Sequence, residues 1–377
     1  MTRKNILMLS VSAGTGHTRA AEALRASAGA GDFNVSAVHL DILQFVTPWL
    51  RLLYANFYML LVKRVPALWG YVYHATNNAR PGGRAHALRR WAERLHCKRL
   101  RAEIAQRAPD IIICTHFLPA EILSRLIAGG TLNCPVWVQV TDFDLHRMWV
   151  HPHMAGYFAP NEEVAFRMRD NGIDTANIHV TGIPIMPVFS QAHARADCAR
   201  ELGIDPHAMT VLLMGGSAAL GSVHEIAERL LGIHDKLQII ALAGKDPQNL
   251  SALQESAARF PGRLVALGYT GQIERLMTCA DVVVTKPGGL TTSEALAMGL
   301  PLIVIAPIPG QEEANANYLL EQGVALQAFD LITLEYRLHY LLSHPLELAQ
   351  MATRARALGR PDAAGRVLKH VLASTES

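Results

Sequence analysis

A histidine follows two glycines early in the sequence, at a position that suits either catalysis or a turn. Residues 7–24 read LMLSVSAGTGHTRAAEAL, so an apolar run gives way to Gly14, Gly16 and His17 and then to a helix-like segment. An imidazole titrates near neutral pH and readily takes a proton from a hydroxyl group. The alternative is a histidine at the start of a helix that hydrogen-bonds its own loop. The local sequence leaves both interpretations open.

The same stretch departs from both common nucleotide-binding fingerprints. In the pattern GxGxxG the third glycine allows close packing of helix on strand, and Arg19 occupies that position here. The Walker A loop carries a lysine that this stretch lacks. The sequence therefore argues against an NAD-dependent oxidoreductase, which is one of the alternative functions.

A glycine-rich loop follows a strand-like run in the second half of the chain. The run TVLLM leads into Gly215, Gly216 and Ser217, and a helical pattern follows after residue 222. Backbone N–H groups and the positive end of a helix would meet at this loop, which suits a phosphate group. The alternative is a tight turn that binds no ligand.

The most informative stretch is residues 280–319, which begin with a buried-strand pattern. A turn at Gly288 and Gly289 follows, and a helix is expected to start near Thr291. The N–H groups of the glycines and the hydroxyls of Thr291 and Thr292 are suited to cradle a diphosphate. Glu294 lies about one helical turn further on, where a carboxylate can accept hydrogen bonds from a ribose diol. In the alternative interpretation, Thr291 and Glu294 form a capping box, and both roles can hold together.

Amide and carboxylate side chains follow the next strand-like run, PLIVIAP. Gln311, Glu312 and Asn315 are expected at the carboxyl end of that strand, where open α/β sheets bind ligands. Such groups at close spacing suit a polyhydroxyl ligand, although they also suit the cap of the following helix.

A second polar cluster follows a strand-like run at residues 135–141. Asp142, Asp144, His146 and two further histidines lie within it, and His116 follows a different strand. Their spacing matches no reliable metal site, so no metal is expected and a polar rim beside a ligand is preferred.

A basic and aromatic block interrupts the first half of the chain. Residues 51–107 contain 12 lysines and arginines and two acids, a net charge of +10. Its apolar stretch, residues 52–62, is shorter than the ~20 residues that span a bilayer. Aromatic groups beside cations suit contact with anionic lipid headgroups. The alternative is an ordinary core helix followed by a solvated basic helix.

Strand-like and helix-like segments alternate throughout both halves, which predicts parallel sheets covered by helices. With 377 residues, of which half are hydrophobic, we expect two domains with separate cores. The predicted divisions are residues 1–188, a hinge at 189–200, a second domain at 201–350 and a C-terminal helix at 351–377. The five cysteines form no CxxC pair, and the N-terminus does not resemble a signal peptide, so a cytoplasmic protein is expected.

Taken together, the segments SAGTGH, TDFDLHRMWVH and TKPGGLTTSEALAMGLPLIVIAPIPGQEEANAN resemble the diacylglycerol glycosyltransferases. This family includes bacterial processive glucosyltransferases and plant monogalactosyldiacylglycerol synthases. The resemblance covers nearly the whole chain and implies a GT-B fold, in which two Rossmann-like domains face each other across a cleft and the last helix often crosses back to the first domain. The chain also resembles, more distantly, the lipid II-forming N-acetylglucosaminyltransferase.

The resemblance implies a role for each group of site residues. His17 matches the proposed general base, and Asp142 is the candidate for orienting it, because the acidic residue that precedes this histidine in the plant enzymes is missing here. Backbone near Tyr269 would bind uracil and Glu294 the ribose. The sugar would contact Gln311, Glu312 and Asn315, and the diphosphate would contact Gly215, Gly216, Ser217, Gly288, Gly289 and Thr291. The acceptor and membrane surface would include Trp49, Tyr54, Phe57, Tyr58, Lys63, Arg64, Trp69, Arg89, Arg90 and His116.

The reaction implied is an inverting transfer of glucose or galactose from a UDP-sugar to diacylglycerol. Because no DxD-like pair accompanies the donor motifs, metal independence is expected, with no cofactor. The partners expected are UDP-sugar, diacylglycerol and anionic lipids at the inner face of the bacterial membrane, and no nucleic acid. The alternatives are transfer to another lipid or soluble acceptor, or a non-catalytic UDP-sugar sensor.

Overall fold

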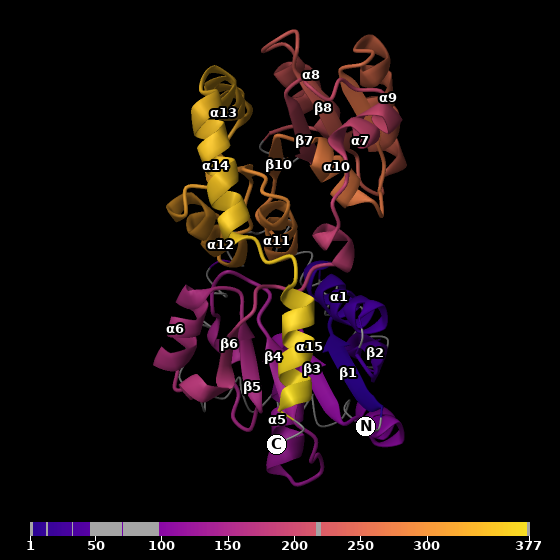
Figure 1. Ribbon diagram of the computed structural model, residues 1–377, viewed down its shortest axis with the longest axis vertical. Coiled ribbons are helices and arrows are strands. Elements are labelled where there is room, and N and C mark those ends of the chain that lie inside the picture. The colour runs from indigo at the N-terminus through magenta and orange to yellow at the C-terminus, as the bar shows by residue number, and fades with distance from the viewer. Residues whose placement is uncertain are drawn as a thin grey trace. The chain divides into compact units, whose positions relative to one another are not determined.

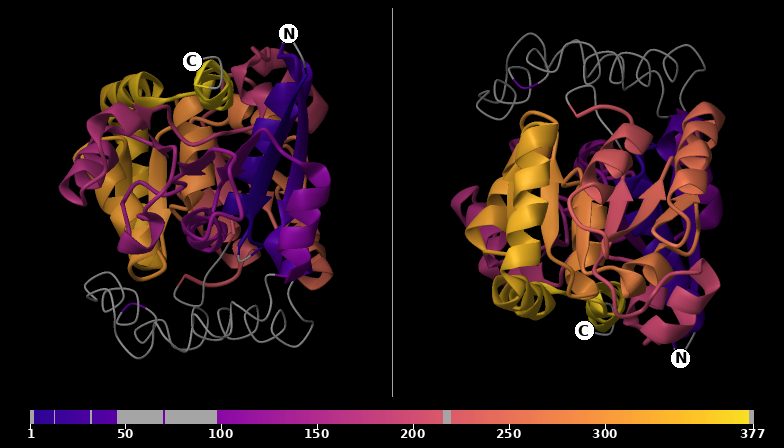
Figure 2. Two further views of the ribbon diagram at one scale, coloured as in Figure 1. Left: turned by 90° about the horizontal axis from the view of Figure 1, so that it is seen from below. Right: turned by 90° about the horizontal axis from the view of Figure 1, so that it is seen from above.

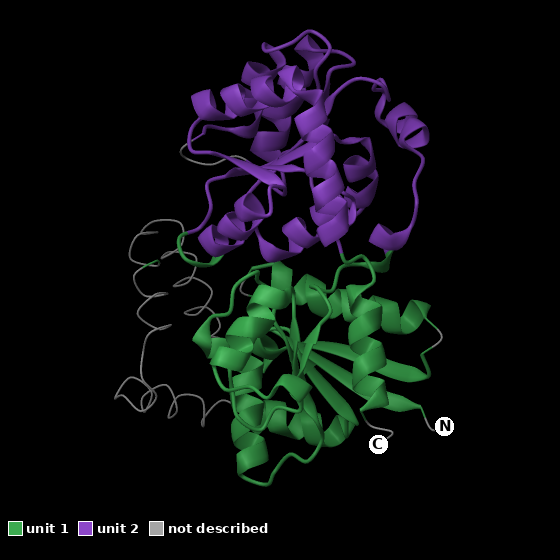
Figure 3. Ribbon diagram, turned by 60° about the vertical axis from the view of Figure 1, so that its left-hand side comes forward, with its two compact units in different colours: residues 1–187, 309–311, 360–377 green, residues 188–308, 312–359 purple. Residues whose placement is uncertain are grey.

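The computed structural model describes residues 3–12, 14–31, 33–45, 70, 98–215 and 220–374. The chain divides into two compact units, which Figure 3 colours separately. Unit 1 comprises Met1–Pro187, Pro309–Gln311 and Arg360–Ser377, and unit 2 comprises Val188–Ile308 and Glu312–Gly359. Each unit is built on its own parallel sheet, as the alternating sequence pattern predicts.

The sheet of unit 1 has six parallel strands in the order β2-β1-β3-β4-β5-β6 (Figure 1). The chain steps from β1 to β2 on one side and then adds the later strands on the other side, so the direction reverses between β1 and β3. The strands are β1 (Lys4–Ser10), β2 (Val35–Asp41), β3 (Ile111–Cys114), β4 (Val136–Gln139), β5 (Gly156–Ala159) and β6 (Ile178–Val180).

Helices cover both faces of this sheet, because its strands are apolar on both sides. Leu7 and Leu9 face one core, and Ile6 and Met8 face the other. Burial of both faces is typical of parallel sheets. Helices α5 (Phe117–Ala128) and α6 (Glu162–Asp170) contribute to the first core, and α1 (Gly16–Ala30) and α15 (Ala363–Ala373) to the second. Residues 98–107 are also helical, and three short 3-10 helices occur: η1 (Ile42–Gln44), η2 (Arg147–Trp149) and η3 (Thr175–Asn177).

The sheet of unit 2 also has six parallel strands, in the order β12-β11-β10-β7-β8-β9. Here the direction reverses between β7 and β10. The strands are β7 (Thr210–Met214), β8 (Gln238–Leu242), β9 (Leu264–Leu267), β10 (Val282–Thr285), β11 (Leu302–Ile305) and β12 (Ala325–Ala328). The sequence pattern predicts all of them except β12, a four-residue strand at the edge of the sheet with a glutamine at its third position.

Eight helices and one 3-10 helix of the described chain accompany this sheet. They are η4 (Pro187–Ser190), which begins at the unit boundary, α7 (Arg195–Leu202), α8 (Val223–Leu231), α9 (Pro247–Arg259), α10 (Ile273–Cys279), α11 (Gly289–Ala297), α12 (Gln311–Glu321), α13 (Leu331–Ser343) and α14 (Pro345–Leu358). The C-terminal helices of this set are among the yellow and orange helices of Figure 2.

The segment expected as a hinge, residues 189–200, belongs to unit 2 and contains most of α7. The guanidinium of Arg195 donates two hydrogen bonds to the Asp281 carboxylate, at 2.8 and 2.9 Å. Arg195 also donates to the carbonyls of Pro206 and Ala208. These bonds connect α7 to unit 2. The units divide between Pro187 and Val188, one residue from the predicted end of the first domain, and the function of residues 189–200 as a hinge stays a prediction.

The C-terminal segment, expected as one helix over residues 351–377, forms parts of two helices. Helix α14 starts at Pro345 and belongs to unit 2, and the chain then returns to unit 1, where α15 packs on the sheet (Figure 1). Gly182 has φ +92° at this contact, and a Cβ placed there would lie 2.6 Å from Cβ of Arg360. The close approach of the returning chain therefore depends on a glycine.

Within the described residues, no helix is long and apolar enough to cross a membrane.

Candidate functional site

In unit 1 the strand order reverses between β1 and β3, at a position called the switch point. The polar residues that the sequence indicates in the first half of the chain lie near this point. His17 is the second residue of α1, which follows β1, and Thr115 and His116 directly follow β3. Thr141 and Asp142 follow β4, the next strand in the sheet. Ligands of open α/β sheets bind outside the carboxyl ends of the strands where the order reverses, so this position is a candidate binding site.

The contacts of one ring nitrogen indicate which tautomer His17 adopts. Its Nδ1 lies 3.0 Å from the carbonyl oxygen of Thr115 and 2.8 Å from the hydroxyl oxygen of Thr141. A carbonyl oxygen only accepts hydrogen bonds, so Nδ1 must carry a proton to make the first contact. In a neutral imidazole the lone pair is then on Nε2, which is the nitrogen able to act as a base.

The backbone of His17 is held by Thr115 as well. The Thr115 hydroxyl donates to the carbonyl oxygen of His17 at 2.9 Å, so Thr115 and His17 are bound to each other twice. These bonds join the start of α1 to the end of β3. The side chain of His17 therefore has a fixed orientation and does not simply fill a turn.

Burial lowers the pKa of His17 below its usual value of 6.5. The negative charge of Asp142 and the hydrogen bond to the Thr115 carbonyl oppose this effect but do not cancel it. A lowered pKa keeps the imidazole unprotonated at neutral pH, which is the form that a general base requires.

His116 lies beside His17 with the opposite tautomer. As the N-cap of α5 it accepts a hydrogen bond from the Leu118 N–H at Nδ1, over 3.0 Å. Its neutral ring therefore carries the proton on Nε2, which makes Nε2 a donor. The two imidazole rings meet edge to face with centroids 4.5 Å apart, and Trp149 lies 6.0 Å from His17. A base and a hydrogen-bond donor are thus adjacent at the end of β3.

Asp142 interacts with His17 through its charge, whereas the hydrogen-bond acceptors at the His17 Nδ1 are Thr115 and Thr141. The Asp142 carboxylate accepts a hydrogen bond of 2.7 Å from the side-chain amide of Gln311, and both residues belong to unit 1. The sequence did not indicate Thr115 and Thr141 as partners of His17. A threonine after a strand is common, and a backbone carbonyl carries no sequence signal.

The other polar residues of the segment 140–164 have local structural roles. Asp144 accepts from the N–H of Leu145 and pairs with Arg167 at 3.3 Å, and His146 caps η2. Within the described ranges, no group of three or more His, Cys, Asp or Glu side chains is arranged to hold a metal ion.

The switch point of unit 2 lies between the two glycine-rich loops that the sequence singles out. Gly215 directly follows β7 with φ +84°, and Gly288 follows β10, the neighbouring strand. Gly288 is the N-cap of α11, and no side chain caps this helix. The first N–H groups of a helix have no acceptor within it, and the helix end carries partial positive charge. This end is therefore suited to a phosphate group.

Helix α11 begins at Gly289, two residues before Thr291, and its N-cap is Gly288, so Thr291 and Glu294 do not form its capping box. Thr292 is fully buried, and its hydroxyl has no hydrogen-bond partner in the part of the chain that the structure describes. Glu294 is also buried, one turn into the helix.

Side chains of α12 connect the two loops that follow β10 and β11. The Asn315 amide donates to the carbonyl of Pro287 at 3.0 Å, and the Glu312 carboxylate accepts from the N–H of Ile308 at 2.8 Å. A Cβ on Gly288 would lie 3.9 Å from the second Glu312 oxygen, so this carboxylate borders the start of α11. Glu312 and Asn315 thus hold the loops of the candidate donor site, and contact with a sugar stays a prediction for them and for Gln311.

Tyr269 lies outside this cluster, after the edge strand β9. Its ring is 65% exposed, and the Lys245 ammonium lies 4.7 Å from the ring centroid. Its predicted role near uracil stays a prediction.

Two groups of predicted site residues lie outside the described residues. They are Gly216 and Ser217 of the donor loop, and the acceptor and membrane residues Trp49, Tyr54, Phe57, Tyr58, Lys63, Arg64, Trp69, Arg89 and Arg90.

Comparison with solved structures defines the class of protein. The chain aligns with MurG of Acinetobacter baumannii at a TM-score of 0.63 and 17% identity, over 98% of this chain and 99% of that chain. It aligns with UDP-GlcNAc 2-epimerase from Neisseria meningitidis, bound to UDP-GlcNAc, at a TM-score of 0.62 and 12% identity, with the same coverage. With two parallel six-stranded sheets, each in its own unit, the protein has the GT-B fold.

Comparison with known sequences identifies the family. Residues 17–185 match the family described as Monogalactosyldiacylglycerol (MGDG) synthase, and residues 210–367 match the Glycosyltransferase family 28 C-terminal domain. The processive diacylglycerol beta-glucosyltransferase of Bacillus licheniformis is 28% identical over 379 residues, covering 100% of this chain and 96% of that protein. Its counterpart in Bacillus cereus strain 03BB102 is 30% identical over 298 residues, covering 75% and 72%. The chain belongs to the diacylglycerol glycosyltransferase family.

Proposed function

We propose that this protein transfers glucose or galactose from a UDP-sugar to the free hydroxyl of diacylglycerol, with inversion at the anomeric carbon. Membership of the family supports the reaction class. The observation that carries the proposal is the His17 ring, whose Nδ1 faces the Thr115 carbonyl and whose Nε2 is therefore a base at a switch point. This arrangement supports a working enzyme over a non-catalytic UDP-sugar sensor.

In the proposed reaction, the acceptor hydroxyl loses its proton to Nε2 of His17 while its oxygen attacks the anomeric carbon. The bond between that carbon and the UDP oxygen breaks, and UDP leaves with the electron pair. The imidazolium that forms keeps its Nδ1–H bond to Thr115, and the negative charge of Asp142 stabilises it. His116, whose ring meets the His17 ring with centroids 4.5 Å apart, would lie beside the same acceptor.

The leaving group would be stabilised by the amino end of α11. Its uncapped N–H groups, together with Gly215 after β7, would stabilise the negative charge that develops on the diphosphate. Glu294 would bind the ribose, and Gln311, Glu312 and Asn315 the hexose. The proposal includes activity without a metal ion or cofactor, and the test of that part is the rate in the presence of EDTA.

The protein would act on the inner surface of the bacterial membrane as a peripheral protein. The +10 charge of residues 51–107 supports attraction to anionic lipids. Diacylglycerol, which stays in the bilayer, would then be reached from the membrane surface.

The test is incubation of the purified chain with UDP-glucose, UDP-galactose or UDP-N-acetylglucosamine and vesicles that contain diacylglycerol, followed by mass analysis of the lipids. We expect a monohexosyl diacylglycerol from one of the two hexose donors. Ceramide and a water-soluble alcohol serve as alternative acceptors in parallel reactions. Transfer to either of these with none to diacylglycerol would overturn the acceptor assignment, and absence of transfer in every reaction would overturn the assignment as a transferase.

A further inference from the structure

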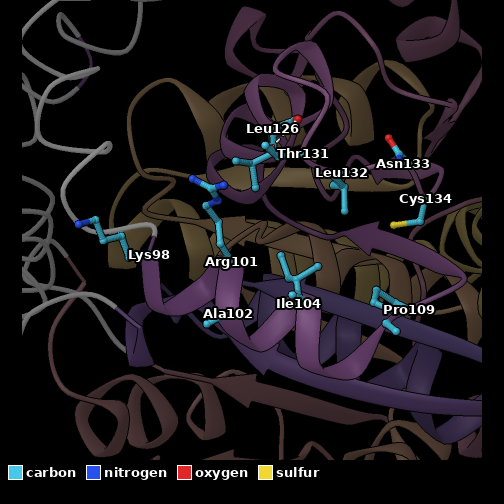
Figure 4. A pocket seen from close by; sticks show the side chains of 12 residues that line it. Lys98, Arg101, Ala102, Ile104, Pro109, Leu126, Thr131, Leu132, Asn133 and Cys134 are labelled. Atoms are coloured by element: carbon cyan, nitrogen blue, oxygen red, sulfur yellow. Dashed lines mark hydrogen bonds between the residues drawn. The ribbon is translucent and has the colours of Figure 1, made fainter.

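A pocket in unit 1 lies away from the candidate site at His17. It has a volume of about 500 Å³ and is shown in Figure 4. Pro109 precedes β3, and Asn133 and Cys134 precede β4, so these lining residues come from the amino ends of the strands. His17 lies at the carboxyl ends, which are at the opposite edge of a parallel sheet. The pocket is therefore separate from the candidate acceptor site.

Most of the pocket wall is apolar. Ile104, on the helix of residues 98–107, and Leu132, on the loop before β4, are largely buried and line the pocket together with Leu126 of α5. Figure 4 shows Ile104 and Leu132 extending into the space between this helix and the loop. The volume lies within the range that takes small organic ligands, about 300–1,000 Å³. A wall of this kind favours an apolar group over a free ion.

Two cations lie at one part of the same pocket. Lys98 and Arg101 are exposed lining residues, and the described residues that line the pocket include no acidic side chain. Within the described chain, neither cation has a hydrogen bond or an ion pair with a side chain. The nearby Glu103 is instead paired with Arg107, at 2.6 Å. Among the described side chains, Lys98 and Arg101 therefore have no partner that an anion entering the pocket would have to displace.

Burial raises the pKa of the Cys134 thiol to about 11, so this lining residue stays neutral at physiological pH. The polar remainder of the lining consists of Thr131, whose hydroxyl donates to the Leu126 carbonyl, and Asn133. Among the described lining residues, the pocket thus combines positive charge with an apolar wall and has no carboxylate. The negative charge of Asp110, which is not one of these lining residues, also raises the pKa of Cys134.

We propose that this pocket binds an anionic phospholipid, with the phosphate at Lys98 and Arg101 and the upper part of one acyl chain against Ile104, Leu126 and Leu132. The phosphate group of such a lipid would contact the two cations, and its acyl chain would cover the apolar wall. Inorganic phosphate would contact the cations only, so the apolar wall would stay exposed to water. The bound lipid is a membrane component and not the acceptor, because diacylglycerol has no charged group for the two cations. The pocket would hold unit 1 on an anionic membrane by one specific lipid, in addition to general attraction by the basic block.

The test uses a soluble short-chain lipid, so that binding to the pocket is separated from attraction to a membrane surface. Dihexanoyl phosphatidylglycerol below its micelle concentration is titrated into the full chain and followed by calorimetry. We expect one site, about tenfold weaker in the double variant Lys98→Gln, Arg101→Gln, since two exposed ion pairs are lost. The variant Ala105→Trp keeps the charge but fills the pocket from an exposed helix position, and we expect it to weaken binding as well.

The matched control is Arg99→Gln, Arg107→Gln, which removes two charges from the same helix without touching the pocket lining. We expect it to bind within about twofold of the wild type. An equal loss of affinity in both double variants would show that binding depends on the general surface charge and would overturn the proposal. Equal binding of dihexanoyl phosphatidylcholine would overturn the role of the cations, and equal binding of inorganic phosphate would overturn the role of the apolar wall. The measurement needs no UDP-sugar, so its outcome is independent of the proposed function.

Discussion

Replacement of His17 by asparagine separates the two functions that the structure gives to this ring. The amide N–H₂ of asparagine takes approximately the place of Nδ1–H, so the hydrogen bond to the Thr115 carbonyl, 3.0 Å long in the wild type, can be kept. Nε2 has no counterpart in asparagine, so the variant loses the base alone. The loop between β1 and α1 should therefore keep its structure while proton transfer is lost.

The magnitude follows from the protonation state of the wild type. Because the pKa of His17 is lowered, nearly every molecule carries the neutral base at pH 7.5, and the substitution removes it from all of them. General-base catalysis contributes about 10²–10⁴-fold, which corresponds to about 2.7–5.4 kcal/mol of transition-state stabilisation. We expect kcat to fall by that factor, whereas the affinity for UDP-sugar should stay within about twofold.

The assay combines initial rates of lipid glycosylation with calorimetric titration of UDP and a thermal unfolding curve for each variant. His207→Asn, at an exposed position in unit 2, is the matched control and should have wild-type rates. A His17→Asn variant that melts like the wild type and turns over within threefold of it would refute the general-base assignment. Loss of UDP binding in this variant would refute the separation of acceptor and donor roles.

Four further predictions test other parts of the account. Activity requires the neutral form of His17, so kcat/KM of the wild type should rise with pH and level off above the lowered pKa of this residue. Asp142→Asn removes a negative charge that raises this pKa, so the acidic limb of the pH–rate profile should move to lower pH in the variant. A shift of the limb to higher pH would contradict the electrostatic role of Asp142. Arg195→Ala should lower the free energy of unfolding by about 1–3 kcal/mol in urea titrations, because Asp281 loses two charged hydrogen bonds; an unchanged midpoint would show that this pair does not fix α7. Gly182→Ala should lower the free energy of unfolding by about 1–2 kcal/mol or more in the same urea titrations, because the residue has a positive φ and its new Cβ would collide with the chain that leads into α15. Wild-type stability of this variant would show that the backbone shifts there at no cost. Addition of EDTA should leave the rate of glycosylation unchanged, and a loss restored by a divalent cation would contradict metal independence.

The sequence pattern predicts the sheets well, because parallel strands are buried on both faces and give short continuous apolar runs. IIIC of β3 and VVVT of β10 are examples, and nearly all of their residues are fully buried. The pattern misses β12, whose four residues, ALQA, lie at an edge and include a partly exposed glutamine. Apolar continuity is a weak signal for an edge strand, since one side of such a strand lacks a neighbour.

The division into units and the partners of His17 depend on contacts that the sequence does not contain. Two prolines mark a change near residue 187, but contacts such as the pairing of Arg195 with Asp281, 86 residues away, connect the following segment to unit 2. Similarly, the sequence indicates His17 as a candidate base, while the group that fixes its tautomer is a backbone carbonyl 98 residues further on. Every residue has a carbonyl, so the topology of the sheet alone selects Thr115.

The most direct test of the central claim is the structure of the lipid product. The wild type and the His17→Asn variant are incubated with diacylglycerol vesicles and whichever hexose donor the wild type uses, and the lipid fraction is analysed by mass and by proton NMR of the anomeric signal. The account predicts a monohexosyl diacylglycerol with β configuration from the wild type, and at most about a hundredth of that product in the same time from the variant. An α-linked product, or equal product from both proteins, would contradict inverting transfer through His17.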